Sequence, residues 1–203
     1  MPFKKLRPEL HEALERLELS QPTPFQTKAI PVVKSGANVY ATAPTGSGKT
    51  TTLVLTTLQK LGGAAEGAAP RAVVIVEDKA KVLELHALFI QFAKYTDLRI
   101  YASYEQLHID VQKSEIFEGI DVLISTPATM NKLFLLNGVS TSQLRLFSVD
   151  DADFLHQKSA GSALLSVAQS LQKCQYVLYA SQLSPQLKRF ENYFMERAKK
   201  VGV

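Results

Sequence analysis

The stretch APTGSGKT, residues 43–50, constrains the fold of this chain more than any other part of its sequence. It follows the apolar run 38–43 and precedes the stretch 49–61, so a predicted strand passes through a glycine-rich turn into a predicted helix. The stretch matches the phosphate-binding loop pattern GxxxxGKT except that Ala43 replaces the first glycine. The alternative is a glycine-rich turn with a chance Lys-Thr, which the strand before it and the helix after it disfavour. The chain is therefore predicted to bind a nucleoside triphosphate.

The residues of this turn have the chemistry that phosphate groups require. Gly46 and Gly48 allow a tight backbone turn, whose N–H groups can converge on phosphate oxygens at a helix N-terminus. Lys49 is expected to place its charge on the outer phosphates, and the Thr50 hydroxyl is expected to hold Mg²⁺. The candidate nucleotide-binding residues of this stretch are Ala43, Pro44, Thr45, Gly46, Ser47, Gly48, Lys49, Thr50 and Thr51.

Strand-like and helix-like stretches alternate along the rest of the chain. The predicted strands are residues 38–43, 71–77, 98–103, 120–126, 144–149 and 175–181. Predicted helices follow Pro8, occupy 49–61 and 82–92, start at Thr126 and Pro127, cover about 160–172, and start again at Ser184 with Leu187, Phe190, Phe194 and Ala198 buried. The small residues 62–70 predict a surface loop. This alternation predicts an α/β fold, with a parallel sheet and helices on both of its faces.

Composition narrows the classes of protein that fit. The chain has 203 residues, 46% hydrophobic and 21% charged, which is ordinary for one globular domain. Its net charge of +4 tolerates a polyanionic partner without requiring one. The single Cys174 excludes an internal disulfide and fits a reducing compartment, so a cytoplasmic location is expected. We expect no membrane span, no secretory signal and no zinc site, because the apolar runs are too short and the four histidines are scattered.

An apolar strand ends in acids at LRLFSVDDADFL, residues 144–155. In nucleotidases that use a phosphate-binding loop, an acid at a strand end holds Mg²⁺ opposite the loop's Ser or Thr. Asp150 is expected to take this role opposite Thr50. The alternative is an aspartate that only caps a helix, and Asp153 in particular could be that and no more.

The identity of the base depends on a second region. A guanine-binding site in this class of protein would contain the motif Asn-Lys-x-Asp. The stretch NKLF at 131–134 has Phe134 in place of the Asp, so it does not match that motif. In QPTPFQTKAIP, residues 21–31, the Gln26 amide offers both a donor and an acceptor, which suits the edge of adenine. Taken alone, Gln26 could equally be a solvated helix residue.

Five stretches in this order, PTPFQ, AIP, APTGSGKT, STP and VDDAD, resemble the N-terminal RecA-like domain of the DEAD-box ATP-dependent RNA helicases. The resemblance covers essentially the whole chain and implies one RecA-like domain of the phosphate-binding-loop NTPase type over residues 1–203. Residues 1–36 would form the Q-motif region and residues 37–203 the core. By the same resemblance, Gln26 reads adenine, Phe3 stacks on the base, the loop 43–50 holds the phosphates of ATP, and Asp150 binds Mg²⁺.

The chain departs from the family at the residues of hydrolysis. The resemblance makes Asp150, Asp151 and Lys49 the catalytic candidates, but the family has Glu where this chain has Asp151. Loss of one methylene group withdraws the carboxylate by ~1.5 Å. A misplacement of ~1 Å can lower a rate on the order of a hundredfold. Weakened hydrolysis is therefore expected.

The family's RNA-facing motifs are also altered. Ala180-Ser181-Gln182 stands for Ser-Ala-Thr, and residues 126–129 stand for Thr-Pro-Gly-Arg. Residues 77–81 replace the PTREL segment and leave Lys79 as the basic candidate there, and the paired glycines expected after the third strand are absent from residues 100–105. RNA, single-stranded or as a short duplex, is the expected partner, bound weakly by this domain alone.

Two interpretations of function remain open. The first is the ATP-binding half of an RNA-dependent ATPase, whose arginine fingers come from a second RecA-like domain in cis. An arginine finger contributes ~10³–10⁵ in rate, so this domain alone is expected to be nearly inactive. The second is an ATP-gated module that binds RNA or a protein partner without catalysis. A small-molecule kinase lacks any recognisable lid or acceptor signature here.

Overall fold

One parallel sheet organises the chain in the computed structural model, which describes residues 3–171 and 173–203. Its strands are β1 (Val39–Thr42), β2 (Ala72–Ile75), β3 (Ile100–Ser103), β4 (Val122–Ser125), β5 (Leu146–Val149), β6 (Gln175–Ala180) and β7 (Lys199–Gly202). Their order across the sheet is β3-β4-β2-β5-β6-β1-β7, and each neighbouring pair runs parallel. All carboxyl ends of the strands therefore meet at one edge, where parallel sheets place their ligands.

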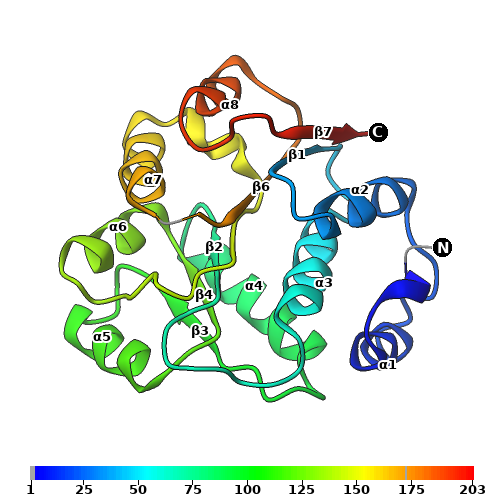
Figure 1. Ribbon diagram of the computed structural model, residues 1–203, viewed down its shortest axis with the longest axis horizontal. Helices are drawn as coiled ribbons and strands as arrows, with labels where there is room; N and C mark the ends of the chain where they lie inside the picture. The colour runs from blue at the N-terminus through cyan, green and yellow to red at the C-terminus, as the bar shows by residue number, and fades with distance from the viewer. Residues whose placement is uncertain (1–2, 172) are drawn as a thin grey trace.

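Helices cover both faces of this sheet. The helices are α1 (Pro8–Arg16), α2 (Pro24–Lys34), α3 (Lys49–Leu61), α4 (Lys79–Phe92), α5 (Ile109–Glu118), α6 (Pro127–Leu135), α7 (Lys158–Ser170) and α8 (Pro185–Lys188), with 3-10 turns η1 (Phe3–Lys5), η2 (Ala152–His156) and η3 (Arg189–Asn192). The first four helices lie on one face and the last four on the other (Figure 1). The expected α/β fold with helices on both faces is confirmed.

Two apolar clusters form the core, one on each side of the sheet. Along β2, Ala72 and Val74 belong to the cluster under α1–α4, whereas Val73 and Ile75 belong to the cluster under α5–α8. Successive strand residues point to opposite faces, so a strand that is covered on both sides is apolar at every position. This is why residues 72–76 form an uninterrupted apolar run.

Local capping signals start several helices where the sequence predicts. Thr126 accepts a hydrogen bond from the Thr129 backbone N–H, and Pro127 occupies the first turn of α6. Ser184 caps α8 in the same way, through the backbone N–H of Leu187. A hydroxyl that accepts an otherwise unpaired N–H stabilises a helix start by about 1 kcal/mol.

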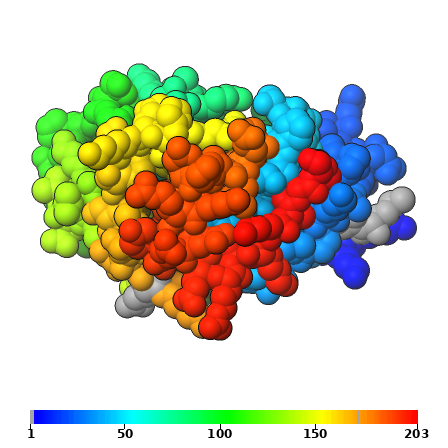
Figure 2. Space-filling view, turned by 90° about the horizontal axis from the view of Figure 1, so that it is seen from above, coloured from blue at the N-terminus to red at the C-terminus, as the bar shows by residue number. Residues whose placement is uncertain are grey.

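The C-terminal region differs from the prediction of one long helix. After α8 and η3 the backbone leaves helical geometry, with φ −129° and ψ −85° at Tyr193 and φ 55° at Arg197. The chain then forms β7, which pairs with β1 and crosses the molecule's surface beside α2 (Figure 2). Phe190 and Phe194 are buried as expected, while Ala198 is only half-buried.

Three further elements, α2, α5 and β7, are not among the predicted ranges. The region of α5 carries few apolar residues, and only Gln112 and Ile116 are buried in it. Within the described residues, no helix has both the length and the apolar character that a membrane crossing needs.

Candidate nucleotide-binding site

The glycine-rich turn joins the carboxyl end of β1 to the first residue of α3. Gly46 and Gly48 have φ of 82° and 90°, the left-handed region that side chains with a Cβ avoid. A Cβ at Gly48 would also lie 2.6 Å from Nε2 of Gln26. The turn therefore needs glycine at this position for both its backbone angle and its close approach to α2.

Lys49 begins α3 and turns its side chain back over the loop. Its Nζ donates hydrogen bonds to the backbone oxygens of Ala43 at 2.7 Å and Pro44 at 3.2 Å. The same ammonium lies 3.8 Å from Oδ1 of Asp151, and only 5% of the lysine side chain is exposed. A desolvated cation at a helix N-terminus attracts anions more strongly than the same group in water does.

Asp150 meets the loop from the end of β5. The Thr50 hydroxyl donates a hydrogen bond of 2.9 Å to Asp150 Oδ2. Burial raises the pKa of Asp150 to about 6, although the bond from Thr50 opposes the shift. The other carboxylate oxygen, Oδ1, is buried without a hydrogen-bond partner among the described residues.

This arrangement fits Mg²⁺. The ion takes oxygen ligands and usually binds through one or two protein groups together with the phosphates of a substrate. Thr50 and Asp150 supply two such groups side by side, and a cation would satisfy the orphaned Asp150 Oδ1. Within the described part of the chain, no cluster of three or more His, Cys, Asp or Glu residues could hold a metal by itself. Phosphate oxygens would have to complete the coordination.

Gln26 ties α2 to the loop. Its backbone N–H donates to Thr23 Oγ1 at 3.1 Å, and its side-chain Oε1 accepts from the Thr23 backbone N–H at 2.9 Å, which completes a capping box. Nε2 of Gln26 donates to the backbone oxygen of Gly48 at 3.5 Å, and the Thr23 hydroxyl donates to the backbone oxygen of Ser47 at 2.7 Å. Thr23 is not among the predicted site residues, although its Thr-x-x-Gln spacing is a capping-box signal.

Asp151 and Asp153 differ in their surroundings. Asp151 has a left-handed backbone, with φ 44° and ψ 50°, and its side chain is 54% exposed. Both oxygens of Asp153 accept hydrogen bonds from Ser181, one from its backbone N–H and one from its hydroxyl, each at 2.7 Å. Asp153 thus links the ends of β5 and β6, a role that goes beyond capping a helix.

The predicted site residues therefore fall into two groups. Gln26, Lys49, Thr50, Asp150 and Asp151 come together around the loop, at the ends of β1, β5 and β6, which we call the nucleotide half of the edge. Within the loop Ala43 is buried, Pro44, Thr45 and Gly46 are exposed, and Ser47 and Thr51 are half-buried. Phe3 is 6% exposed and belongs to the core under α1–α4, so its ring offers little surface for a base.

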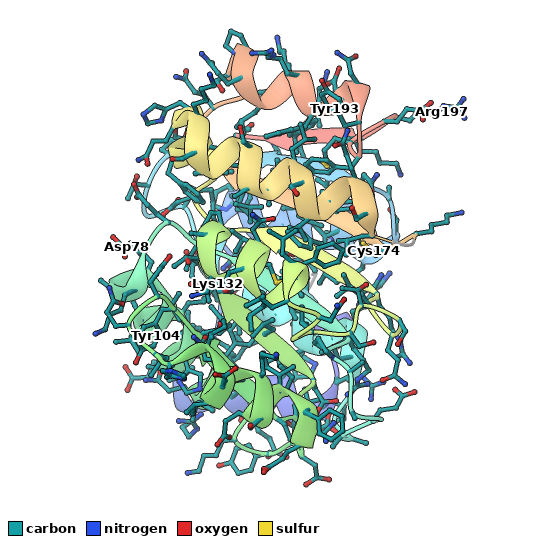
Figure 3. All side chains as sticks on the ribbon, turned by 90° about the vertical axis from the view of Figure 1, so that its left-hand side faces the viewer. Asp78, Tyr104, Lys132, Cys174, Tyr193 and Arg197 are labelled. Carbon is teal, nitrogen blue, oxygen red and sulfur yellow. The ribbon has the colours of Figure 1, made fainter. Side chains whose placement is uncertain are left out.

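The RNA-side candidates lie elsewhere on the same edge. Lys79 follows β2 and Thr126 follows β4, and with the residues after β3 they form what we call the outer half of the edge. In Figure 3, Asp78 of the outer half and Tyr104 after β3 lie on the side of the molecule opposite Cys174.

Comparisons with known proteins agree with this geometry. A sequence model of the DEAD/DEAH box helicase family matches residues 23–189. The chain is 27% identical over 197 residues to the probable ATP-dependent RNA helicase ddx27 of Dictyostelium discoideum, covering 96% of this chain and 25% of that protein. It is 31% identical over 156 residues to the ATP-dependent RNA helicase dbp9 of Neosartorya fischeri, covering 74% and 25%. The chain thus spans about a quarter of these relatives' length.

Solved structures share the fold. A hypothetical ATP-dependent RNA helicase from Sulfolobus tokodaii superposes with a TM-score of 0.86 at 17% identity, over 98% of this chain and 57% of that one. A dbp5 variant from S. cerevisiae, bound to gle1 and ip6, gives 0.84 at 21% identity, over 98% and 50%. At such identities the likeness shows the fold alone, which is the expected RecA-like α/β fold. The match of the family model over most of the chain shows more: this chain belongs to the DEAD/DEAH box helicase family.

Proposed function

We propose that this chain binds Mg-ATP as the ATP-binding part of an ATP-dependent RNA helicase that remodels RNA together with a second domain. The observation that carries the proposal is the pairing of Thr50 with Asp150 beside the buried Lys49, at the mouth of the glycine-rich turn. Family membership supports the same activity, because the curated relatives described above are ATP-dependent RNA helicases.

In this proposal the loop and α3 hold the triphosphate. The backbone N–H groups of residues 45–50 cradle the phosphates, and Lys49 gives up its bonds to the backbone oxygens of Ala43 and Pro44 to reach them. Thr50 and Asp150 would hold Mg²⁺ against the outer phosphates. When bound, the ion supplies positive charge against the charge that develops on the transferred phosphoryl group.

Gln26 is proposed to recognise adenine from the start of α2. Its amide already bonds to Thr23 and Gly48, so its position is fixed by the loop that holds the phosphates. Base recognition and phosphate binding would therefore be coupled through residues 21–26 and 47–48. Phe3 has no part in the proposal, because its buried ring would have to leave the core to stack on a base.

Asp151 is proposed to orient the attacking water, less well than the family's glutamate does. Its carboxylate is exposed at the site and lies near Lys49, but it is one methylene group shorter. Asp153 and Ser181 would pass changes at the nucleotide to the end of β6. Arginine fingers would come from the second domain, so the chain alone should hydrolyse ATP very slowly.

A second candidate function is an ATP-gated module without significant turnover. The short acid at position 151 favours it, because nucleotide binding does not need this carboxylate whereas hydrolysis does. A protein partner would fit such a module, since one structural relative is bound to gle1.

Calorimetric titration with ATP, ADP and GTP, each with and without Mg²⁺, tests the proposal. We expect adenine nucleotides to bind more tightly than GTP and to need Mg²⁺ for full affinity. Gln26→Ala should lower the affinity for ADP while leaving that for GTP nearly unchanged. The exposed Gln169→Ala on α7 is the matched control. Equal affinity of the unchanged chain for ATP and GTP would remove the role of Gln26, and no binding at all would contradict the proposed function.

A further inference from the structure

The outer half of the strand edge has polar groups suited to an anion. Thr126 lies at the N-terminus of α6, where the aligned backbone dipoles favour negative charge. Lys79 begins α4, which follows β2, the strand that neighbours β4. A nucleic-acid backbone that extended from the nucleotide half along this edge would meet both groups.

The Thr126 hydroxyl is already engaged by an acid of the same chain. It donates a 2.5 Å hydrogen bond to Glu105 Oε1, and it accepts a 3.2 Å hydrogen bond from the Thr129 backbone N–H. Thr126 and Thr129 are buried, at 1% and 3% exposed, whereas Glu105 is exposed and reaches in from the loop after β3. A carboxylate thus sits where the N-terminus of α6 would receive a phosphate group.

Tyr104, the residue before Glu105, engages Lys79, the one cationic group of the pair. The Lys79 ammonium lies 5.1 Å from the centre of the Tyr104 ring, a distance typical of a cation–π contact. Glu77 and Asp78 precede Lys79 at the exposed end of β2 and add negative charge to the same surface. The two residues after β3 therefore cover one phosphate-seeking group on each of the two neighbouring strands.

We propose that Glu105 is a specificity-determining residue that occupies the anion position at the N-terminus of α6 and keeps phosphate backbones off the outer half. The proposal rests on the proposed function only in taking RNA as the polyanion that approaches this edge. Tyr104 assists by holding Lys79 over its ring. A like charge at the contact point disfavours a polyanion, and a neutral side chain at position 105 removes that repulsion. A side chain too short to reach Thr126 also leaves its hydroxyl free to donate to a phosphate oxygen.

The test compares the unchanged chain with Glu105→Gln and Glu105→Ala. Glutamine keeps the shape and can still accept the bond from Thr126, so it guards against a variant that fails to fold. Glu118→Gln is the matched control, because Glu118 is an exposed acid at the far end of α5, near the opposite edge of the sheet. The probe is a single-stranded uridine oligonucleotide, with affinity measured across a salt series. ADP titration of each variant reports the nucleotide site separately.

Glu105→Gln should bind the oligonucleotide more tightly at low salt because the repelling charge is gone. Glu105→Ala should bind it on the order of tenfold more tightly, because it also frees the Thr126 hydroxyl. In Glu105→Ala the slope of log affinity against log salt should steepen by about 0.7, which corresponds to one added phosphate contact. Thr126→Val introduced into the Glu105→Ala chain should abolish most of the gain. Unchanged RNA affinity and slope in both Glu105 variants, with ADP binding intact, would overturn the proposal and leave Glu105 with only its bond to the cap residue Thr126. Failure of the unchanged chain to bind ADP would instead contradict the proposed function, and the comparison between RNA affinities would still stand.

Discussion

The two halves of the strand edge use similar groups in opposite ways. In the nucleotide half, Asp150 is buried, its pKa is raised by that burial, and one of its oxygens lacks a partner among the described residues. In the outer half, Glu105 is exposed and bonded to Thr126, and Lys79 lies over Tyr104. The buried Asp150 carboxylate of the nucleotide half destabilises the fold, and a bound cation would offset this. The charged groups of the outer half already have partners within the chain.

This difference teaches which part of the edge can gain from a ligand. An unpaired buried carboxylate oxygen costs free energy in the folded chain, so a ligand that satisfies it binds more tightly. The Glu105 carboxylate already accepts a short hydrogen bond from a buried hydroxyl, so it gains little from a bound cation. Its negative charge repels an anion. The nucleotide half is therefore the part expected to take a ligand without any change in sequence.

The largest expected effect comes from removing the positive charge of Lys49 in the nucleotide half. Lys49→Ala should weaken binding of ATP roughly tenfold to a hundredfold, because a hydrogen bond to a charged group contributes about 1.5–3 kcal/mol. Calorimetric titration measures the change. Lys94→Ala is the matched control, since Lys94 is an exposed lysine just after α4 at the opposite edge. Equal ATP affinity in the Lys49 and Lys94 variants would show that the loop is not the phosphate site.

The next effect concerns the cost of the buried acid. Asp150→Asn should raise the free energy of unfolding on the order of 2 kcal/mol at pH 8 without nucleotide, because it removes a charge that burial disfavours. A carboxyl whose folded pKa is raised to about 6 destabilises the fold above that pH. The gain should therefore shrink as the pH falls through about 6 and vanish below about 4.

Denaturant unfolding at a series of pH values measures this gain. The exposed Asp97→Asn is the control and should change stability little at any pH. A loss of stability in Asp150→Asn at pH 8 would mean that the carboxylate is stabilised by its neighbours, and the contrast between the two halves would fail.

A smaller effect is expected from restoring the longer acid. Asp151→Glu should raise ATP turnover about tenfold, which corresponds to ~1.4 kcal/mol of barrier, when the chain is joined to a second domain of the family. Asp tolerates the left-handed backbone at this position better than Glu does, so nucleotide affinity serves as the check on folding. Unchanged turnover with intact ATP binding would favour the ATP-gated module.

The smallest effect separates backbone angle from close approach at the loop. Gly48→Ala and Gly36→Ala both place a Cβ on a left-handed backbone, with φ of 90° and 82°, at a cost of about 1 kcal/mol each. Only the Cβ at position 48 meets Gln26, at 2.6 Å, while nothing lies within 4 Å at position 36. Thermal unfolding should therefore show the larger loss for Gly48→Ala, and only this variant should weaken ATP binding. Identical losses would mean that Gln26 moves aside freely.

Sequence reasoning located the nucleotide half because its signals are local. The turn 43–50 carries its own conformation in Gly46 and Gly48, and a helix start follows it directly. The acid at the end of a buried strand could be matched to Thr50 because carboxyl ends of parallel strands share one edge. That pairing is present at 2.9 Å.

The outer half and the C-terminus could not be found in the same way. The bond between Glu105 and Thr126 and the bonds between Asp153 and Ser181 join different strand ends, and no local pattern marks them. The expected last helix is wrong because its apolar spacing also suits a short helix followed by turns. Pairing of β7 with β1, far away in the sequence, decides the outcome. The stacking role of Phe3 stays a prediction, and the burial of its ring could not be read from the sequence.

Backbone amide chemical shifts, recorded while Mg-ATP is added to the unchanged chain, test the contrast between the two halves most directly. The account predicts large shifts at residues 45–50 and at Asp150, with smaller ones at Gln26. Residues 104–105 and 126–129 should keep their shifts. Shifts as large at Glu105 and Thr126 as at Gly48, or none at the loop, would contradict the account.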